Sequence, residues 1–235
     1  MLFYFIRHAD PVYDPDSLTP LGKRQAEALA KRLAMHGIDK IYSSTSNRAV
    51  MTAKPTCELL KKDMETLDFA LESHAWREFT VERNGKRMWI FHDPEIKKIL
   101  EDPAVAELGH KWYEYPGLGE YRAGIERVYK DAFDFFKTLG YEHIGNSGMY
   151  KIEKQNNERV AFFAHQGFGL AFLSVILGIP YPTFVTRFDL SHSSMTVINF
   201  SEEDGISMPK VLTLSSDSHI YREGLPTKYN NGIYI

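Results

Sequence analysis

The chain opens on a short apolar run, Leu2-Phe3-Tyr4-Phe5-Ile6, that ends directly in the pair Arg7-His8. A run of this length, rich in aromatic residues, predicts a buried β-strand. In an open α/β sheet, ligands bind just beyond the carboxyl ends of the strands. An arginine there can grip a phosphate with paired hydrogen bonds, and a histidine can act as nucleophile or proton carrier. The opening residues therefore predict a phosphate-handling site at the edge of a sheet.

The rest of the chain alternates between helix and strand patterns. Thr19-Pro20 supplies an N-cap followed by a proline at the first helical position, and Gly37 supplies a stop signal. We expect helices at 20–37, 48–60, 94–100, 120–139 and 167–177, and strands at 39–43, 65–71, 159–164, 195–200 and 210–214. This alternation indicates an α/β fold of three layers (α/β/α), with helices on both faces of a mostly parallel central sheet. We expect residues 1–235 to form a single domain.

The stretch from about residue 79 to residue 150 has a different character. It is rich in aromatic side chains, and it carries turn signals at Asn84-Gly85, Asp102-Pro103 and Pro116-Gly117. Two of the expected helices lie inside it. We expect this stretch to be a mostly helical insertion that forms a cap over the end of the sheet.

Net charge and cysteine content narrow the range of partners. The net charge is −3 at neutral pH, so the protein as a whole does not attract nucleic acid or an anionic membrane. No apolar run approaches the length of a membrane span, and Arg7-His8 interrupts the opening run before it could serve as a signal peptide. The single cysteine, Cys57, excludes an internal disulfide and fits a reducing compartment. We therefore expect a cytoplasmic protein with no membrane or nucleic-acid partner, and the oligomeric state stays open.

Two of the expected strands end in the same way, because His165 follows 159–164 as His8 follows the first strand. If the two strands are neighbours, both imidazoles converge at one edge of the sheet. Arg48 stands at the start of a helix after a serine-rich turn, where partial positive charge and free N–H groups favour an anion. Two arginines, two histidines and a helix start would together enclose a tetrahedral oxyanion.

Four blocks of sequence carry a family resemblance: Phe5-Ile6-Arg7-His8-Ala9-Asp10, Leu18-Thr19-Pro20-Leu21-Gly22, residues 42–53 (YSSTSNRAVMTA) and Phe163-Ala164-His165-Gln166-Gly167. In this order they resemble the histidine phosphatase superfamily, which includes the phosphoglycerate mutases. The resemblance covers most of the chain outside the expected cap. It implies a phosphatase that acts on a small phosphorylated metabolite through a phosphohistidine intermediate.

The resemblance also implies roles for individual residues. His8 resembles the family's nucleophile, Arg7 and Arg48 its phosphate clamp, and His165 the second histidine that binds the phosphoryl oxygens. The mechanism requires no metal or other cofactor, since the fixed cations neutralise the phosphoryl charge.

The family's proton donor is a carboxylate at the base of the insertion. The segment Trp76-Arg77-Glu78-Phe79 is similar to the family pattern around that acid, so we expect Glu78 to be the donor. Glu72 and Glu82 lie close enough in sequence to remain alternatives. We also expect Gln166 and Ser193 to contribute to substrate binding.

The chain departs from the family pattern at several positions. Ala9 replaces the usual glycine after Arg-His, Gln166 replaces a glycine, and the mutase signature gives way to Asp10-Pro11-Val12-Tyr13-Asp14. The last departure favours a phosphatase over a phosphoryl mutase. The other two leave open a phosphate-binding regulatory protein without turnover. A metallohydrolase that uses His8, Asp10 and His165 is disfavoured, because the flanking arginines would repel a cation.

The sequence does not identify the substrate. Arg83, Lys86 and Arg87 form a basic group in the expected cap. They either make a second anion site or belong to a solvated turn.

Overall fold

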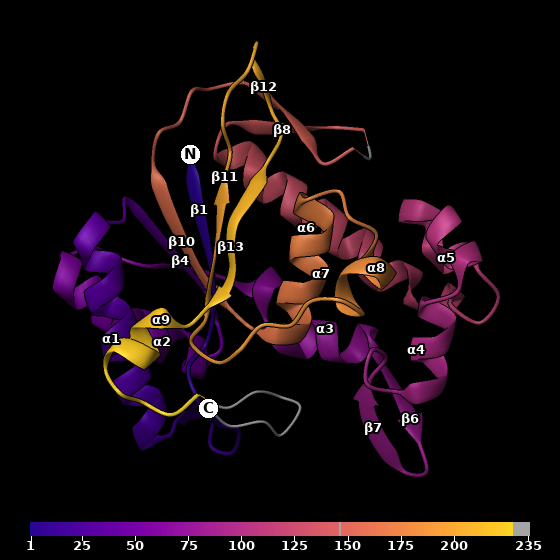
Figure 1. The fold of residues 1–235 in the computed structure, drawn as a ribbon, viewed down its shortest axis with the longest axis horizontal. Helices are drawn as coiled ribbons and strands as arrows, with labels where there is room; N and C mark the ends of the chain where they lie inside the picture. Colours follow the sequence, from indigo (N-terminus) through magenta and orange to yellow (C-terminus); the bar gives the residue numbers. More distant parts are fainter. Residues whose placement is uncertain (146, 228–235) are drawn as a thin grey trace.

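A six-stranded sheet forms the centre of the protein in a computed structural model that describes residues 1–145 and 147–227 (Figure 1). The strand order is β13-β11-β1-β10-β4-β5. Four neighbouring strands run parallel to one another: β1, β10, β4 and β5. Strand β11 pairs antiparallel with both β1 and β13. The strands are β1 (Leu2–Arg7), β4 (Lys40–Ser44), β5 (Glu65–Leu67), β10 (Arg159–Ala164), β11 (Met195–Asn199) and β13 (Lys210–Ser216).

The opening run is continuously apolar because both faces of β1 are buried. Successive side chains of a strand point to opposite faces. Phe3 and Phe5 belong to one hydrophobic cluster, and Tyr4 and Ile6 belong to another on the other face. A strand covered on both sides needs apolar residues at every position, which is the pattern of a parallel sheet between helical layers.

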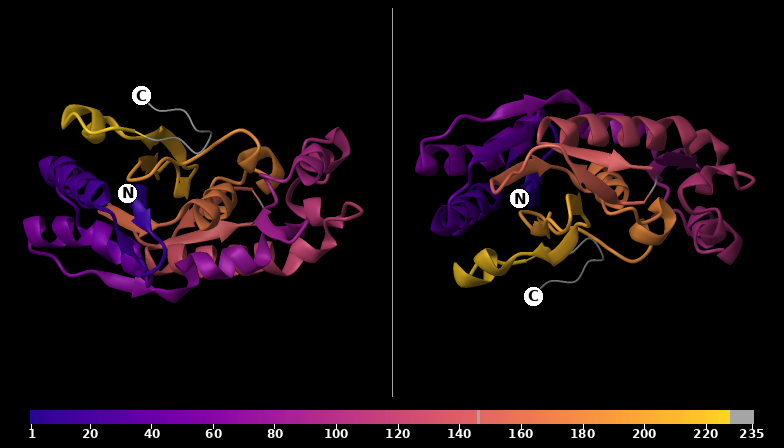
Figure 2. Two further views of the ribbon diagram at one scale, coloured as in Figure 1. Left: turned by 90° about the horizontal axis from the view of Figure 1, so that it is seen from below. Right: turned by 90° about the horizontal axis from the view of Figure 1, so that it is seen from above.

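Helices cover both faces of the sheet, which confirms the expected three-layer α/β fold (Figures 1 and 2). One layer contains α1 (Pro20–His36), α2 (Asn47–Leu60) and α9 (Ser218–Arg222). The other contains α3 (Glu72–Glu78), α6 (Arg122–Thr138), α7 (Gln166–Ile176) and α8 (Tyr181–Val185). Helix α1 begins as expected, because Thr19 Oγ1 accepts a hydrogen bond from the Gly22 N–H at 3.0 Å. The strand expected at 65–71 stops at Leu67, and a 3₁₀ turn, η1 (Asp68–Ala70), follows it.

The structure divides the stretch 79–150 into parts with different places in the fold. Helix α6 lies in a helical layer, where Phe136 packs 5.2 Å from Phe3 and Phe135 packs 5.4 Å from Phe162 between ring centroids. The segments before α6 lie at the end of the molecule away from α1 and α2 (Figure 2). These are β6 (Thr80–Arg83), β7 (Lys86–Trp89), α4 (Pro94–Leu100), α5 (Pro103–Glu107), η2 (Gly109–Glu114) and η3 (Gly119–Tyr121).

Three small sheets complete the described part of the fold. Strands β2 (Pro11–Val12) and β3 (Ser17–Leu18) pair in the loop between β1 and α1, and β6 pairs with β7 through the turn at Asn84-Gly85. The third sheet contains β8 (Tyr141–Ile144), β9 (Met149–Ile152) and β12 (Ile206–Ser207). In the described part of the chain, no helix has both the length and the apolar character needed to cross a bilayer.

Candidate active site

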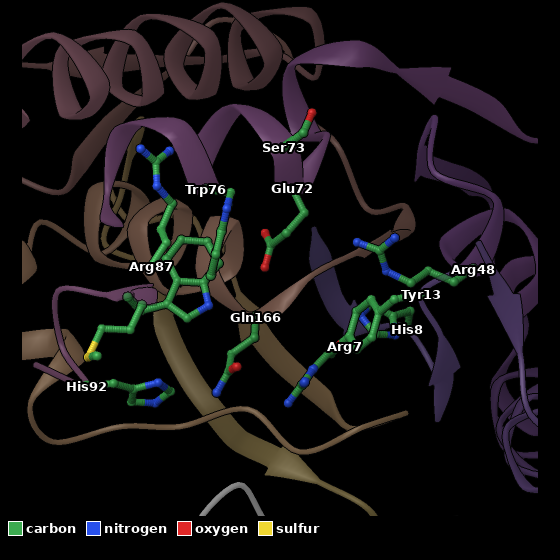
Figure 3. A pocket seen from close by; sticks show the side chains of 12 residues that line it. Arg7, His8, Tyr13, Arg48, Glu72, Ser73, Trp76, Arg87, His92 and Gln166 are labelled. Carbon is green, nitrogen blue, oxygen red and sulfur yellow. The ribbon is translucent and has the colours of Figure 1, made fainter. Parts of the chain in front are cut away.

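A cavity of about 570 Å³ opens where β1 and α7 meet the segment from α3 to β7 (Figure 3). Arg7, His8 and Arg48 line one end, which we name the cationic end. The other end, which we name the aromatic end, is formed by Trp76, Arg87, Met88, Trp89 and His92. Glu72 points into the space between the two ends (Figure 3).

The register of the sheet brings the two histidines together. Strands β1 and β10 are parallel neighbours with Arg7 opposite Ala164, so His8 and His165 leave adjacent strands at the same level. Their ring centroids lie 5.2 Å apart. His165 is fully buried, and the Ser44 Oγ lies 2.9 Å from its Nε2. The convergence expected from the two strand ends is therefore present.

The tautomer of His8 follows from its hydrogen bond. Its Nδ1 lies 2.8 Å from the carbonyl oxygen of Ala9. Because a carbonyl can only accept, Nδ1 carries the proton and Nε2 keeps its lone pair. Burial lowers the pKa of His8 well below its usual value, and the nearby His165, Arg7 and Arg48 lower it further. His8 is thus a neutral imidazole with a nucleophilic Nε2.

Both arginines at the cationic end are held by other parts of the chain. Arg7 donates from Nη1 to the carbonyl oxygen of Leu190, and its Nη2 lies 2.7 Å from Nε2 of His192. Arg48 donates from Nη1 to Asp16 Oδ1 at 2.8 Å. Each guanidinium therefore has a fixed orientation before any ligand binds.

The start of α2 does not serve the site as expected, because Asp16 occupies it. Asp16 Oδ2 accepts hydrogen bonds from Ser46 Oγ and the Asn47 N–H, both at 2.8 Å. The anion that the helix start favours is thus a side chain of the protein itself. Arg48 still reaches the cavity, so the arginine and the helix start have separate roles.

Three buried nitrogens of this cluster have no hydrogen-bond partner among residues 1–145 and 147–227. They are Arg7 Nε, Arg48 Nε and His165 Nδ1. A buried donor without an acceptor is costly, and native proteins avoid it. Arg7 and Arg48 line the cavity, so a tetrahedral oxyanion beside His8 is suited to accept hydrogen bonds from this cluster.

Among the described residues, Glu72 is the one carboxylate that lines the cavity. It stands at the start of α3, and its two oxygens accept the Gly167 and Phe168 N–H groups at 2.9 and 2.8 Å. Burial raises the pKa of Glu72, while these two hydrogen bonds and the nearby Arg48 and Arg7 partly offset the shift. A carboxyl group with a raised pKa, placed beside the cationic end, is suited to proton transfer.

Glu78 lies outside the cavity, in contrast to our expectation. Its two carboxylate oxygens accept from Nε and Nη2 of Arg127 at 2.6 and 2.7 Å, so it joins α3 to α6. Glu72 and Trp76 are four residues apart and share a face of α3. Glu78 is six residues after Glu72, so its side chain leaves the helix about 120° from that of Glu72. Glu82 is exposed on β6 and also lies outside the cavity.

This chain resembles known proteins in both sequence and fold. Residues 3–128 match the model of the histidine phosphatase superfamily (branch 1). The chain belongs to this superfamily. It is 23% identical to phosphoserine phosphatase 1 of Hydrogenobacter thermophilus in an alignment of 228 residues that covers 92% of each chain.

Solved structures of the superfamily share the fold. A mutant phosphoserine phosphatase from Entamoeba histolytica, in complex with phosphoserine, superposes with a TM-score of 0.60 at 18% identity and covers 93% of this chain and 98% of its own. The α-ribazole phosphatase of Shigella flexneri gives 0.59 at 15% identity, covering 92% and 97%. A mycobacterial glucosyl-3-phosphoglycerate phosphatase gives 0.58 at 16% identity, covering 92% and 98%.

The departures from the histidine phosphatase pattern are accommodated without strain. Ala9 is fully buried, has no left-handed backbone, and donates its N–H to Thr52 Oγ1 at 3.0 Å. Gln166 lines the cavity, and its amide Nε2 donates to Asp189 Oδ1. An alanine therefore fits where the family has glycine.

Ser193 does not line the cavity, although we expected it to bind substrate. Its backbone is left-handed, with φ of 59°, and its Oγ lies 3.1 Å from His219 Nε2. Its N–H donates to the His8 carbonyl at 3.0 Å. Ser193 thus holds the backbone of His8 in place and does not face the cavity.

The sequence patterns do not predict several residues of the site. They are Tyr13, Asp16, Trp76, Met88, Trp89 and His92. Trp76 was within reach, because it shares a helix face with Glu72. No sequence pattern predicts that Met88 and Trp89 line the cavity, because this depends on how the hairpin of β6 and β7 packs on the rest of the protein. Within the described residues, no three His, Cys, Asp or Glu side chains form a group suited to a metal ion.

Proposed function

We propose that this protein is a metal-independent phosphatase that hydrolyses a small phosphomonoester through a phosphohistidine intermediate. The observation that carries the proposal is that His8, Arg7 and Arg48 line one end of the cavity, with the ring of His165 5.2 Å from that of His8 and three unpartnered buried nitrogens in this cluster. The relatives named as phosphatases act as support, because they share the fold over most of the chain.

In the first step, Nε2 of His8 attacks phosphorus in line with the leaving oxygen. The bond between phosphorus and that oxygen breaks, and the Glu72 carboxyl donates its proton to the departing alkoxide. Arg7, Arg48 and His165 neutralise the charge on the equatorial oxygens. The products are the free alcohol and a phosphohistidine at His8.

In the second step, the Glu72 carboxylate takes a proton from a water molecule, which attacks phosphorus and breaks the bond to Nε2. Inorganic phosphate leaves, His8 returns to its neutral form and Glu72 is protonated again. One water is consumed for each ester hydrolysed. Glu72 suits both roles because it lies between the two ends of the cavity (Figure 3).

The test is phosphate release by the full chain in EDTA, with a panel of phosphomonoesters and no phosphoryl acceptor. Wild type should release phosphate, and His8→Ala should lose more than about 10⁴-fold in kcat, as expected when a nucleophile is removed. His36→Ala changes an exposed histidine at the end of α1 and serves as the matched control. Rapid quenching of wild type should trap an acid-labile, base-stable phosphoryl group that His8→Ala lacks.

The alternatives give other results in the same assay. A phosphoryl mutase would need an acceptor or a bisphosphate primer before phosphate moved. A regulatory protein would bind phosphate without turnover. Loss of activity in EDTA would point to a metallohydrolase.

The reducing, cytoplasmic location expected from Cys57 is part of the same proposal.

A further inference from the structure

The aromatic end of the cavity carries an inference about the substrate, and this inference rests on the proposed function. The cavity holds about 570 Å³. The heavy atoms of one phosphate group fill roughly 150 Å³ if each takes the ~30 Å³ that a water molecule occupies in the liquid. Most of the cavity therefore remains for the alcohol part of the ester, and the residues around that space select the alcohol.

Two indole rings form the wall of this space. Trp76 comes from α3 and Trp89 from β7, and their ring centroids lie 4.9 Å apart at an interplanar angle of 86°. Trp89 also stacks on Phe91, with centroids 5.6 Å apart and an angle of 11°. Both indoles line the cavity and are part-buried. A flat ring entering the space would meet aromatic faces and edges that are already in place.

The position of Trp89 is fixed by a glycine at the start of α7. A Cβ added to Gly167 would lie 2.2 Å from Cη2 of Trp89, so the indole packs directly on the helix backbone. The N–H of this glycine also donates to Glu72. The aromatic wall and the proposed proton donor are therefore held by the same turn of α7.

Arg87 supplies a cation at this end of the cavity. It is exposed, it lines the cavity, and it lies two residues before Trp89 on β7, so both side chains share a face of the hairpin. Within the described residues Arg87 makes no ion pair, although Glu82 lies opposite it in the hairpin register. Arg83, in contrast, is paired with Asp93 and Glu95 at 2.8 Å each. Of Arg83, Lys86 and Arg87, Arg87 alone lines the cavity.

We propose that the alcohol part of the substrate is a flat aromatic or heteroaromatic ring with an anionic substituent, which the protein recognises through Trp76 and Trp89 on the ring and Arg87 on the substituent. Aromatic rings pack well in stacked and edge-to-face arrangements, and both are offered here. An arginine binds a carboxylate or a second phosphate with paired hydrogen bonds. Binding pockets commonly combine apolar walls with a few such polar groups.

The experiment compares three phosphomonoesters of primary alcohols, so that the leaving oxygen is chemically similar in each: glycerol 1-phosphate, benzyl phosphate and 4-carboxybenzyl phosphate. Wild type should show a kcat/KM about tenfold higher for benzyl phosphate than for glycerol 1-phosphate, given the strength of an aromatic contact. The carboxylated ester should gain about a further fivefold from Arg87.

Variants assign the preference to residues. Trp89→Leu should lower kcat/KM for benzyl phosphate about tenfold more than for glycerol 1-phosphate. Arg87→Gln should lower kcat/KM for the carboxylated ester about fivefold more than for benzyl phosphate. Lys86→Gln, on the same strand but outside the cavity, is the matched control and should change neither ratio. Trp76→Leu replaces Trp89→Leu in the test if the latter melts below the assay temperature.

The outcomes separate the two proposals. If wild type hydrolyses none of the three esters or any other phosphomonoester, the proposed function fails. If it hydrolyses all three with equal kcat/KM, or with a preference that the tryptophan and Arg87 variants leave unchanged, the substrate inference is overturned while the phosphatase stands.

Discussion

The cationic end of the cavity is built on two adjacent strands of the central sheet, whereas the aromatic end is built on α3 and a two-stranded hairpin. His8 and His165 are buried and fixed by the register of β1 and β10. Trp89 is part-buried and Arg87 is exposed, and both lie on β7, which within residues 1–145 and 147–227 pairs with β6 alone. The sheet thus holds the groups that act on the phosphate, and a separate element holds those that meet the alcohol. Substitutions at the aromatic end should change substrate preference and leave the chemistry in place.

Glu72 lies between the two ends, and its loss should have the largest effect of the variants considered below. Glu72→Gln keeps the size of the side chain but cannot transfer a proton. We expect kcat to fall by about 10²–10⁴-fold, the usual contribution of a general acid or base. Steady-state turnover of benzyl phosphate and of glycerol 1-phosphate measures this loss, which should be similar for both esters.

Glu78→Gln is the matched control, since it makes the same change on the same helix. Because Glu78 pairs with Arg127 outside the cavity, we expect kcat to stay within about threefold of wild type, while the free energy of unfolding falls by about 1–3 kcal/mol. Denaturant unfolding and turnover measure the two effects. A large loss of kcat in Glu78→Gln together with a small one in Glu72→Gln would mean that Glu78 is the proton donor.

The pH profile should show the two opposite pKa shifts at the site. His8 must be neutral to attack, and its lowered pKa keeps it neutral at mildly acid pH. Glu72 must be protonated to donate, and its raised pKa keeps part of it protonated in the same range. We therefore expect kcat/KM to peak at mildly acid pH and to fall by about tenfold per pH unit well above the pKa of Glu72.

Comparison with Glu72→Gln isolates the contribution of the carboxyl group. The substrate phosphate itself ionises at about pH 6, but this ionisation is common to both proteins. The difference between the two profiles is therefore the readout, and Glu72→Gln should lose the fall on the alkaline side that wild type shows. Superimposable profiles would mean that another group donates the proton.

The same contrast explains how much of the protein was predictable from its sequence. Arg7, His8 and His165 meet at one edge of the sheet, as the apolar runs before them predict, because parallel neighbouring strands end at the same edge. Gln166 lines the cavity, as expected for a residue that directly follows His165. The segment Trp76-Arg77-Glu78-Phe79 points to Glu78 as the proton donor, whereas the structure places Glu72 in the cavity and Glu78 against Arg127. Trp89 and Asp16 reach the site through tertiary packing. No local sequence pattern therefore predicts that they belong to it.

A smaller effect is expected at Asp16, which orients Arg48 at the cationic end. Burial alone would raise the pKa of Asp16, but the hydrogen bonds from Arg48 and Ser46 outweigh it and lower the pKa. Asp16→Asn removes the charge that holds Nη1 of Arg48, so we expect kcat/KM to fall by about tenfold for every ester, since a misplaced binding group costs transition-state stabilisation.

Asp14→Asn, an exposed carboxylate in the same loop, is the control for Asp16→Asn and should leave kcat/KM unchanged. The loss of the negative charge at the start of α2 should also lower the free energy of unfolding of Asp16→Asn by about 1 kcal/mol, measured by denaturant unfolding. An increase in kcat/KM would instead mean that Asp16 competes with the phosphate for Arg48.

The smallest effect is expected at Gly167, and it tests whether the aromatic end depends on the fixed position of Trp89. In Gly167→Ala the new Cβ would overlap the indole, so Trp89 must move. We expect the preference for benzyl phosphate over glycerol 1-phosphate to fall by about threefold, part of the value of one aromatic contact. Gly119→Ala adds a methyl group with a nearest neighbour at 3.8 Å and should leave the preference unchanged. Because the Gly167 N–H also binds Glu72, an equal loss of kcat/KM for both esters would show that the substitution acts through the proton donor, and the two ends would then not be separable at this residue.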